Sequence, residues 1–327
     1  MSATYTTVAR SLPKLSLYIS PDPTPEELTF AAQLGVECVY TWIRDEQRNL
    51  AYLTDLRKRV EDAGLELYNV GNLTVGKSDR IHLALPGRDE AIADFCSFVN
   101  DLGKAGIHVT TFTWEPDQTW SSKPGESRSA VARRVSMEEL RRVPLTHGRV
   151  YSRKELWDNF QYFMERIIPV AEDAGVRLAL HPNDPPTDEQ IGGIPCLIHN
   201  AETYRKAFAI ANSNALGMEF CTGCWLEGGE AFGDILDGIR EFAADGRILI
   251  VHFRNVTSTL PEFVETFLDN GYMDMSTIMR TLVEVGYTGT VTLDHTPRFI
   301  GDYAKGAGPA YSVGYMRALL KVAAQGR

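Results

Sequence analysis

The chain has 327 residues, of which 44% are hydrophobic and 23% are charged, and its formal net charge is −10. This composition is typical of a folded globular protein and argues against intrinsic disorder. The acidic balance argues against a nucleic-acid partner, because such partners are bound through clustered Lys and Arg. No apolar run approaches the roughly 18 residues of a membrane span, and the N-terminus lacks a signal-peptide pattern, so we expect a cytoplasmic protein with no membrane partner.

A recurring join organises the chain, in which a helix-like stretch ends at Gly and a β-rich run follows directly. Glycine just past a helix is the usual left-handed cap, and a β-branched run after it is typical of a buried parallel strand. Eight strands are expected, in chain order over Leu15–Ile19, Cys38–Trp42, Glu66–Val70, His108–Phe112, Arg177–His181, Gly217–Cys221, Ile248–Phe253 and Gly289–Asp294. Helical periodicity lies between them, for example over Leu53–Ala63, Ala91–Leu102, Leu156–Ala174 and Met275–Val285.

Eight alternating units predict an α/β protein with a (β/α)₈ TIM barrel, forming one domain over residues 1–327. Thr24 with Pro25, and Ser136 with Glu139, have the spacing of helix starts, the second pair that of a capping box. No Gly-x-Gly-x-x-Gly follows the first strand, so no nucleotide cofactor is expected. The long polar segment at about 115–150 predicts a lid over the barrel mouth, with a solvated insertion as the alternative.

Four consecutive predicted strands end in residues that can bind a metal. They are His181, Cys221, His252 and Asp294. Because the carboxyl ends of barrel strands meet at one rim, these four side chains are expected at a single site. Two imidazoles, a thiolate and a carboxylate suit one divalent ion, and ligand softness alone favours Zn²⁺ or Fe²⁺. The five cysteines have no dense spacing, which argues against disulfides, and Cys224 is interpreted as structural or pocket-lining.

Several segments, taken together and in this order, resemble the mannonate dehydratases, which are metal-dependent lyases on a xylose-isomerase-like barrel. The segments are Leu83–Glu90, Leu156–Glu172, His181–Pro186, Phe220–Gly223, Val251–Val256, Asp294–His295 and Ala310–Ser312. The resemblance implies that the four metal-binding side chains hold Mn²⁺, and that His295 and Tyr311 transfer protons. It also implies that water is removed from D-mannonate or a related aldonate to give a 2-keto-3-deoxy acid.

Further residues near the strand ends have two interpretations each. Arg254 either pairs with a substrate carboxylate or braces the rim. Arg298, after the eighth strand, is a weaker candidate for the same two roles. Asp184 is expected at the substrate site, holding a ligand histidine in its tautomer. Trp114 either forms a pocket wall or packs the long segment. The alternatives for His295 and Tyr311 are an orienting role and packing of the last helix.

The sequence departs from the family pattern at positions that are expected to determine the choice of substrate. Thr41-Trp42 stands where the family has a His-His pair, and Asn69-Val70-Gly71-Asn72 replaces Val-Val-Glu-Ser. Ile194-Pro195-Cys196 replaces Leu-Pro-Arg, and Leu293 replaces Pro. We therefore expect the small-molecule partner to be a sugar acid or related polyol, or a less polar compound. Two other functions stay open, a metal-dependent sugar isomerase or epimerase and a non-catalytic sugar-acid binding protein, and the oligomeric state is open between monomer and homo-oligomer.

Overall fold

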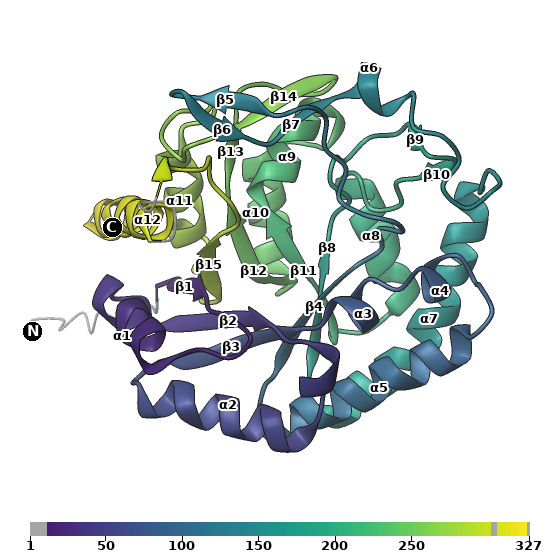
Figure 1. Cartoon of the computed structure of the whole chain (residues 1–327), viewed down its shortest axis with the longest axis horizontal. Coiled ribbons are helices and arrows are strands. Elements are labelled where there is room, and N and C mark those ends of the chain that lie inside the picture. The colour runs from purple at the N-terminus through teal and green to yellow at the C-terminus, as the bar shows by residue number, and fades with distance from the viewer. Residues whose placement is uncertain (1–11, 302–305, 326–327) are drawn as a thin grey trace, which may run out of the picture.

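The computed structural model describes residues 12–301 and 306–325, and its centre is a sheet of eight parallel strands curved into a nearly closed barrel (Figure 1). The strands are β1 (Lys14–Tyr18), β2 (Cys38–Trp42), β3 (Glu66–Gly71), β4 (Val109–Thr113), β8 (Arg177–His181), β11 (Leu216–Cys221), β12 (Ile248–Phe253) and β15 (Thr290–Leu293). Their order in the sheet is β3-β2-β1-β15-β12-β11-β8-β4. At the seam between β3 and β4, Asn69 Nδ2 donates a hydrogen bond to Thr111 Oγ1 at 2.9 Å. The predicted TIM barrel is confirmed, with each strand within two residues of its expected bounds.

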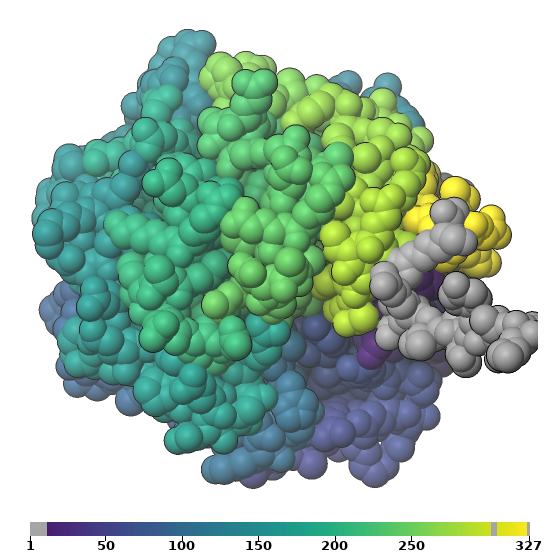
Figure 2. Space-filling model, turned by 180° about the vertical axis from the view of Figure 1, so that it is seen from behind, coloured from purple at the N-terminus to yellow at the C-terminus, as the bar shows by residue number. Residues whose placement is uncertain are grey.

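One long helix follows each barrel strand and covers the outside of the barrel (Figure 1). These helices are α1 (Pro25–Leu34), α2 (Leu50–Asp62), α5 (Arg88–Ala105), α7 (Arg153–Ala174), α8 (Ala201–Ala211), α10 (Ile235–Ala244), α11 (Met275–Glu284) and α12 (Ala307–Gln325). Shorter helical turns are α3 (Leu73–Gly76), α4 (Asp79–His82), η1 (Asp45–Gln47), α6 (Met137–Leu140), α9 (Thr222–Gly228) and η2 (Gly229–Ala231). Seen from behind, the segments follow one another around the molecule in chain order, from teal through green to yellow (Figure 2). Among the described residues, no helix is both long and apolar enough to span a membrane.

The residues at the helix ends explain why helices and strands alternate so regularly along the chain. Thr24 caps α1 by accepting a hydrogen bond from the Glu27 amide, and α1 ends at Gly35 with a positive φ of 72°. The expected capping box at Ser136 is wrong, because the Ser136 side chain makes no capping hydrogen bond. Glu139 accepts hydrogen bonds from Arg134 and from the Lys123 backbone instead. The tertiary contacts of this segment therefore replace the local cap.

The segment 115–150 is built from short strands. It contains β5 (Gly125–Ser127), β6 (Ala130–Ala132), β7 (Arg134–Ser136) and α6, and the loop after β12 adds β13 (Asn255–Val256) and β14 (Glu262–Thr266). β7 pairs antiparallel with β14, and Figure 1 shows β5, β6, β7 and β14 side by side at one edge of the barrel. A two-residue pair, β9 (Gln190–Ile191) with β10 (Ile194–Pro195), follows β8. Hydrogen bonding to β14 thus gives the long segment a fixed position.

Candidate active site

The predicted metal-binding residues meet at the carboxyl ends of neighbouring strands. One donor atom each from His181, Cys221 and His252 lies within 4.8 Å of the others. Cys221 and His252 are directly paired in register between β11 and β12. Asp294 follows β15, and its Oδ2 lies 3.7 Å from Cys221 Sγ while its Oδ1 lies 3.5 Å from His252 Nδ1. The barrel therefore brings all four side chains together, as the strand ends predict.

The orientation of His181 is set by the backbone next to it. Nδ1 of His181 lies 2.7 Å from the Pro182 carbonyl oxygen. Because a carbonyl only accepts, Nδ1 donates this hydrogen bond, and Nε2 is the nitrogen left for a metal. Burial lowers the pKa of His181, but the hydrogen bond with Cys221 and the charge of its thiolate outweigh it and raise the pKa to about 9, so a metal would take the place of the Nε2 proton. The prediction that Asp184 orients a ligand histidine is wrong, because Asp184 pairs with Arg133 at 2.6 Å and with Arg254 at 2.9 Å. Asp184 does line the cavity, as expected of a substrate-site residue.

Negative charge surrounds the candidate metal-binding residues. Burial raises the pKa of the Cys221 thiol, but the hydrogen bond with Cys224 and the charge of Arg254 outweigh it, so that the pKa falls well below its ordinary value. Burial lowers the pKa of His252, but the carboxylates of Glu219 and Asp294 outweigh it and the pKa rises well above its usual range. A divalent cation at this point would balance the thiolate and carboxylates.

Glu219 also belongs to this site, although it is not among the residues predicted from the sequence. Its Oε1 lies 2.6 Å from His252 Nε2, and its side chain is buried. Both ring nitrogens of His252 thus face carboxylates, Nε2 that of Glu219 and Nδ1 that of Asp294 at 3.5 Å. Glu219 precedes Cys221 by two residues on β11, and strand periodicity places such residues on one face. That spacing is the signal from which Glu219 was predictable.

Arg254 is fully buried and contacts two of the candidate metal-binding residues, Asp294 and Cys221. Its Nε lies 2.9 Å from Asp294 Oδ2, Nη1 lies 2.9 Å from Glu227 Oε1, and Nη2 lies 2.9 Å from Asp184 Oδ2. Its Nη1 also contacts Glu265, and the cavity-lining residues do not include it. The bracing interpretation of Arg254 is therefore favoured over a substrate contact, because its nitrogens are engaged by the protein's own carboxylates.

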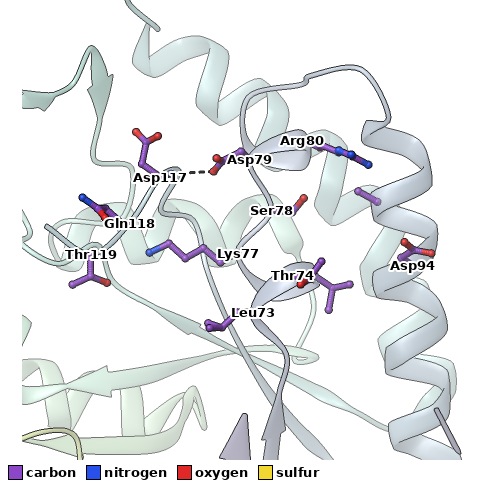
Figure 3. Close-up of a pocket in the computed structure, with 12 residues that line it drawn as sticks. Leu73, Thr74, Lys77, Ser78, Asp79, Arg80, Asp94, Asp117, Gln118 and Thr119 are labelled. Carbon is purple, nitrogen blue, oxygen red and sulfur yellow. Dashed lines mark hydrogen bonds between the residues drawn. The ribbon is translucent and has the colours of Figure 1, made fainter. Parts of the chain in front are cut away.

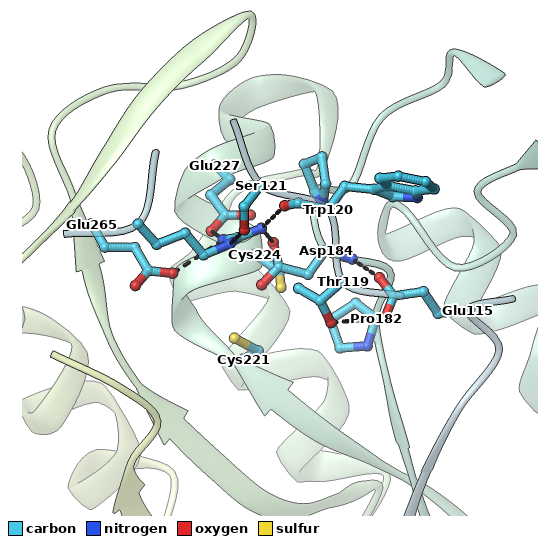
Figure 4. A network of polar contacts seen from close by, with 12 residues as sticks. Glu115, Thr119, Trp120, Ser121, Pro182, Asp184, Cys221, Cys224, Glu227 and Glu265 are labelled. Atoms are coloured by element: carbon cyan, nitrogen blue, oxygen red, sulfur yellow. Dashed lines mark hydrogen bonds and ion pairs between the residues drawn. The ribbon is translucent and has the colours of Figure 1, made fainter. Parts of the chain in front are cut away.

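Three residues outside the predicted set, Arg133, Glu227 and Glu265, complete this buried network of charges. Arg133 contributes ion pairs to Asp184 at 2.6 Å and to Glu265 at 3.1 Å. Figure 4 shows Asp184, Glu227 and Glu265 directed toward a common centre above Cys221 and Cys224. Gly223 makes room for the network, since a Cβ there would lie 2.0 Å from Arg254 Nε. Cys224 is buried beside Arg254, consistent with a structural role.

His295 lies at the boundary between this network and the cavity. Its Nδ1 is 2.8 Å from Glu265 Oε2, its Nε2 is 3.1 Å from Asp294 Oδ1, and it lines the cavity. Burial lowers the pKa of His295, but the charges of Asp294 and Glu265 outweigh it, so that the pKa is raised. This geometry suits a histidine that moves a proton beside a bound metal ion.

The cavity at the mouth of the barrel has a volume of about 550 Å³. The metal-side residues His181, Asp184, Glu219, His252, Asp294 and His295 form one part of its lining. The opposite part comes from β1 to β4 and the segments after them. It consists of Leu17, Tyr18, Tyr40, Trp42, Leu73, Lys77, Thr111, Phe112, Thr113, Glu115 and Thr119. The size is in the range of small-molecule sites.

Besides Cys221 and Arg254, three predicted site residues lie outside the cavity lining. Trp114 is 1% exposed and packs against His82, Phe160 and Phe163, so the structure supports its packing alternative. Arg298 is exposed, and its backbone amide donates to the Val131 carbonyl at 2.8 Å. Tyr311 on α12 donates a hydrogen bond to Asp269, and burial together with this bond raises its pKa to about 12. No contact in the described residues brings Tyr311 to His295.

A second cavity of about 750 Å³ lies beside the first and shares Leu73, Lys77 and Thr119 with it. Figure 3 shows Lys77 between Thr119 and Ser78 on its wall, with the hydrogen bond from the Asp117 amide to Asp79 behind. Lys77 Nζ forms an ion pair with Glu115 at 2.7 Å. Lys77 thus lines both cavities, and its partner Glu115 lines the first.

The fold and site define an enzyme of the xylose-isomerase-like TIM-barrel class. A structure of a xylose isomerase domain protein from Planctomyces limnophilus matches with a TM-score of 0.65 and 14% identity, over 97% of this chain and 99% of that one. Mannonate dehydratase from Streptococcus suis matches with a TM-score of 0.85 and 26% identity, over 97% and 96% of the two chains.

Sequence comparison gives the family. The family model for D-mannonate dehydratase (UxuA) matches residues 130–326. A mannonate dehydratase of Thermotoga petrophila is 30% identical over 308 residues, covering 83% of this chain and 82% of the relative, and one of Streptococcus pneumoniae is 29% identical over 92% and 89%. The chain belongs to the D-mannonate dehydratase family. The predicted resemblance and the predicted lyase class, that of hydro-lyases, are both confirmed.

Proposed function

We propose that the protein removes water from D-mannonate or a related sugar acid and releases a 2-keto-3-deoxy acid. One observation carries the proposal. His181, Cys221, His252 and Asp294 converge at one end of the cavity, with His295 beside them, in a chain of the D-mannonate dehydratase family. Four of the segments that resemble the family carry these residues. They are His181–Pro186, Phe220–Gly223, Val251–Val256 and Asp294–His295, and all four reach this end of the cavity.

The same four residues are the proposed holders of a divalent ion, with Mn²⁺ as the expected metal and Fe²⁺ or Zn²⁺ as alternatives. Two imidazoles, a thiolate and a carboxylate fit such an ion, and the hydrogen bond from His181 Nδ1 leaves Nε2 as the nitrogen for the metal. When bound, the metal supplies Lewis-acid stabilisation of charge on the substrate carboxylate and its neighbouring hydroxyl.

The chain's own part in the reaction is proton transfer and positioning. Dehydration takes a proton from C2 and gives one to the C3 hydroxyl. The C3–O bond breaks, a C2–C3 double bond forms, and the resulting enol tautomerises to the ketone. His295 has the position to move one of these protons at Nε2, because Glu265 engages Nδ1 at 2.8 Å. The buried charges of Arg254 and Arg133 hold Glu265 in place for this role.

We propose that the chain is one barrel domain and that the segment 115–150 covers the mouth of the barrel. Access to the site would then depend on this segment. Arg133 from this segment reaches Asp184 and Glu265, so the cover is tied to the site by ion pairs. Glu115 and Thr119 from its first turn line the cavity. A cover that excludes water strengthens the electrostatic contacts beneath it.

An assay of the purified full chain with Mn²⁺ and a panel of aldonates tests the proposal. Mass spectrometry is expected to show a product lighter than its substrate by one water, which reacts with semicarbazide as a ketone. A product of unchanged mass would identify an isomerase or epimerase instead. Absence of turnover across D-mannonate and its related acids would contradict the dehydratase assignment.

A further inference from the structure

The half of the cavity that faces the candidate metal-binding residues contains a wall of apolar and aromatic side chains beside a group of polar ones. Tyr18 from β1 and Tyr40 and Trp42 from β2 lie along it, with the rings of Tyr18 and Tyr40 in edge contact at 5.7 Å. Leu17 and Phe112 are buried at the cavity with exposures of 6% and 1%. We propose, resting on the dehydratase function above, that the substrate is a 2,3-dihydroxy acid whose carbon chain beyond C3 is apolar.

The position of Trp42 depends on Gly71 in the neighbouring strand. Trp42 and Gly71 are register partners between β2 and β3. A Cβ placed on Gly71 would lie 2.5 Å from two carbon atoms of the Trp42 ring, a distance that real side chains do not reach. The indole therefore occupies the space that any side chain at position 71 would need. A side chain at 71 and the indole of Trp42 in this position exclude each other, and this chain has the indole.

Most polar side chains in this half of the cavity already have partners within the protein. Lys77 Nζ pairs with Glu115 at 2.7 Å, and Thr119 Oγ1 donates to Glu115 at 3.1 Å. Thr111 Oγ1 accepts a hydrogen bond from Asn69. Thr113 Oγ1 is buried without a partner among the described residues, and it offers one contact.

A fully hydroxylated chain does not suit this wall. D-mannonate carries hydroxyls on C4, C5 and C6, beyond the two carbons that react. Against aromatic ring faces these hydroxyls would lose their water without regaining hydrogen bonds, and such unpaired buried groups reduce affinity. An apolar tail would instead bury its surface against the rings of Trp42, Tyr18 and Tyr40. The geometry thus favours a deoxygenated tail over a polyol.

The test compares two acids of equal carbon number on the Mn²⁺-supplemented full chain. One is D-mannonate, and the other is 2,3-dihydroxyhexanoate with the same C2 and C3 configuration, which lacks the hydroxyls on carbons 4 to 6. The expected kcat/KM is at least about tenfold higher for the hexanoate. Equal or higher kcat/KM for D-mannonate would overturn the inference and leave the dehydratase function standing.

Binding separates the inference from the function on which it rests. If neither acid loses water but calorimetry shows tighter binding of the hexanoate, the proposed function fails and the apolar-tail inference holds. If calorimetry shows that D-mannonate binds as tightly as the hexanoate, or that neither binds, the inference fails. Each outcome therefore decides the question.

Two variants test whether the pair formed by Trp42 and Gly71 determines the preference for an apolar tail. Trp42→His is expected to move the ratio of the two kcat/KM values toward D-mannonate by at least about tenfold. Gly71→Ala is expected to weaken hexanoate binding by displacing the indole, and to have little effect in the Trp42→His background. Tyr162→His is the matched control, because Tyr162 lies on α7 outside the cavity. An unchanged ratio in Trp42→His would overturn the assignment.

Discussion

Glu265 Oε2 lies 2.8 Å from Nδ1 of His295, and this contact decides which nitrogen of the ring is left for chemistry. The other nitrogen, Nε2, lies 3.1 Å from Asp294 Oδ1 at the edge of the cavity. Glu265 is itself fixed by Arg254 and Arg133, so the orientation of His295 depends on a buried network that begins on distant strands. A histidine held in this way is prepared for proton transfer before the substrate arrives.

Loss of the His295 ring is expected to remove most of the activity. We expect His295→Ala to lower kcat by about 10²- to 10⁴-fold, the usual contribution of a general acid or base. Glu265→Gln is expected to keep the ring in place but to lower its pKa, because it removes one of the carboxylates that raise it. The limb of the kcat–pH profile that reports His295 should then move to lower pH. An unmoved profile in Glu265→Gln would show that the contact is only structural.

Tyr311 provides the comparison for the proton-transfer assignment. Its hydroxyl donates to Asp269, and its pKa is raised to about 12 by burial and this hydrogen bond. Because Tyr311 does not line the cavity, we expect Tyr311→Phe to lower kcat by less than about tenfold. A loss as large as that in His295→Ala would restore Tyr311 as a catalytic residue.

The guanidinium of Arg254 is expected to be essential for stability. Arg254→Met would remove the guanidinium that Asp294 contacts and one of the two arginines that contact Asp184 and Glu227, and breaking a buried ion pair costs about 3–5 kcal/mol. Urea unfolding measures this loss in the free energy of unfolding.

The control is Arg142→Met, which removes an exposed pair with Glu138 on one helical turn and is expected to cost about 0.5 kcal/mol or less. Similar stability losses in the two variants would contradict the bracing role of Arg254.

The barrel and the convergence of the proposed metal-binding residues were predictable because both depend on local sequence. Each glycine join marks a helix end and a strand start, and a residue at the end of a barrel strand must face the rim. His181, Cys221 and His252 are therefore found by position alone. Trp114, by contrast, comes just past the end of β4, yet its ring packs into the core. The position of a residue at a strand end predicts that it lies at the rim of the barrel. For a residue just past the strand, it does not predict the direction of the side chain.

The supporting network could not be predicted because long-range pairing creates it. Arg133 reaches Glu265 only because β7 pairs with β14, and nothing in the local sequence of either strand specifies that partner. Glu227 lies on α9, a turn of helix that gives no strand-end signal. Arg254 was recognised by its position but not in its role, since that role depends on carboxylates from separate loops.

The thiolate of Cys221 is expected to be required for metal binding. We expect Cys221→Ser to reduce the metal bound per chain and to lower activity with it, because a hydroxyl is a far weaker ligand than a thiolate for Mn²⁺, Fe²⁺ or Zn²⁺. Elemental analysis after dialysis against limiting metal measures the bound ion.

Cys96→Ser is the matched control, because Cys96 is a half-buried thiol on α5 away from the site and its replacement is expected to keep full metal content. Equal metal content in the Cys221 and Cys96 variants would exclude Cys221 as a ligand.

His82 is expected to make the fold sensitive to acid. The residue is 2% exposed, its ring lies 4.5 Å from that of Trp114, and burial, with the nearby charge of Lys77, lowers its pKa to about 3. The unfolded chain, with a histidine pKa near 6.5, binds a proton in the range where the folded chain does not. The contribution of His82 is thus complete above pH 6.5 and is lost as the pH falls toward 3.

Between pH 7 and pH 5 this linkage is worth about 2 kcal/mol of the free energy of unfolding. We expect His82→Gln to reduce the difference between the two pH values by that amount, measured by urea unfolding of chelator-treated protein so that metal binding does not add to it. The exposed His108, replaced by Gln, is the control and should leave the difference unchanged. If His82→Gln kept the full pH dependence, the ring would have to be protonated in the folded protein, and its packing against Trp114 would need a hydrogen-bond partner.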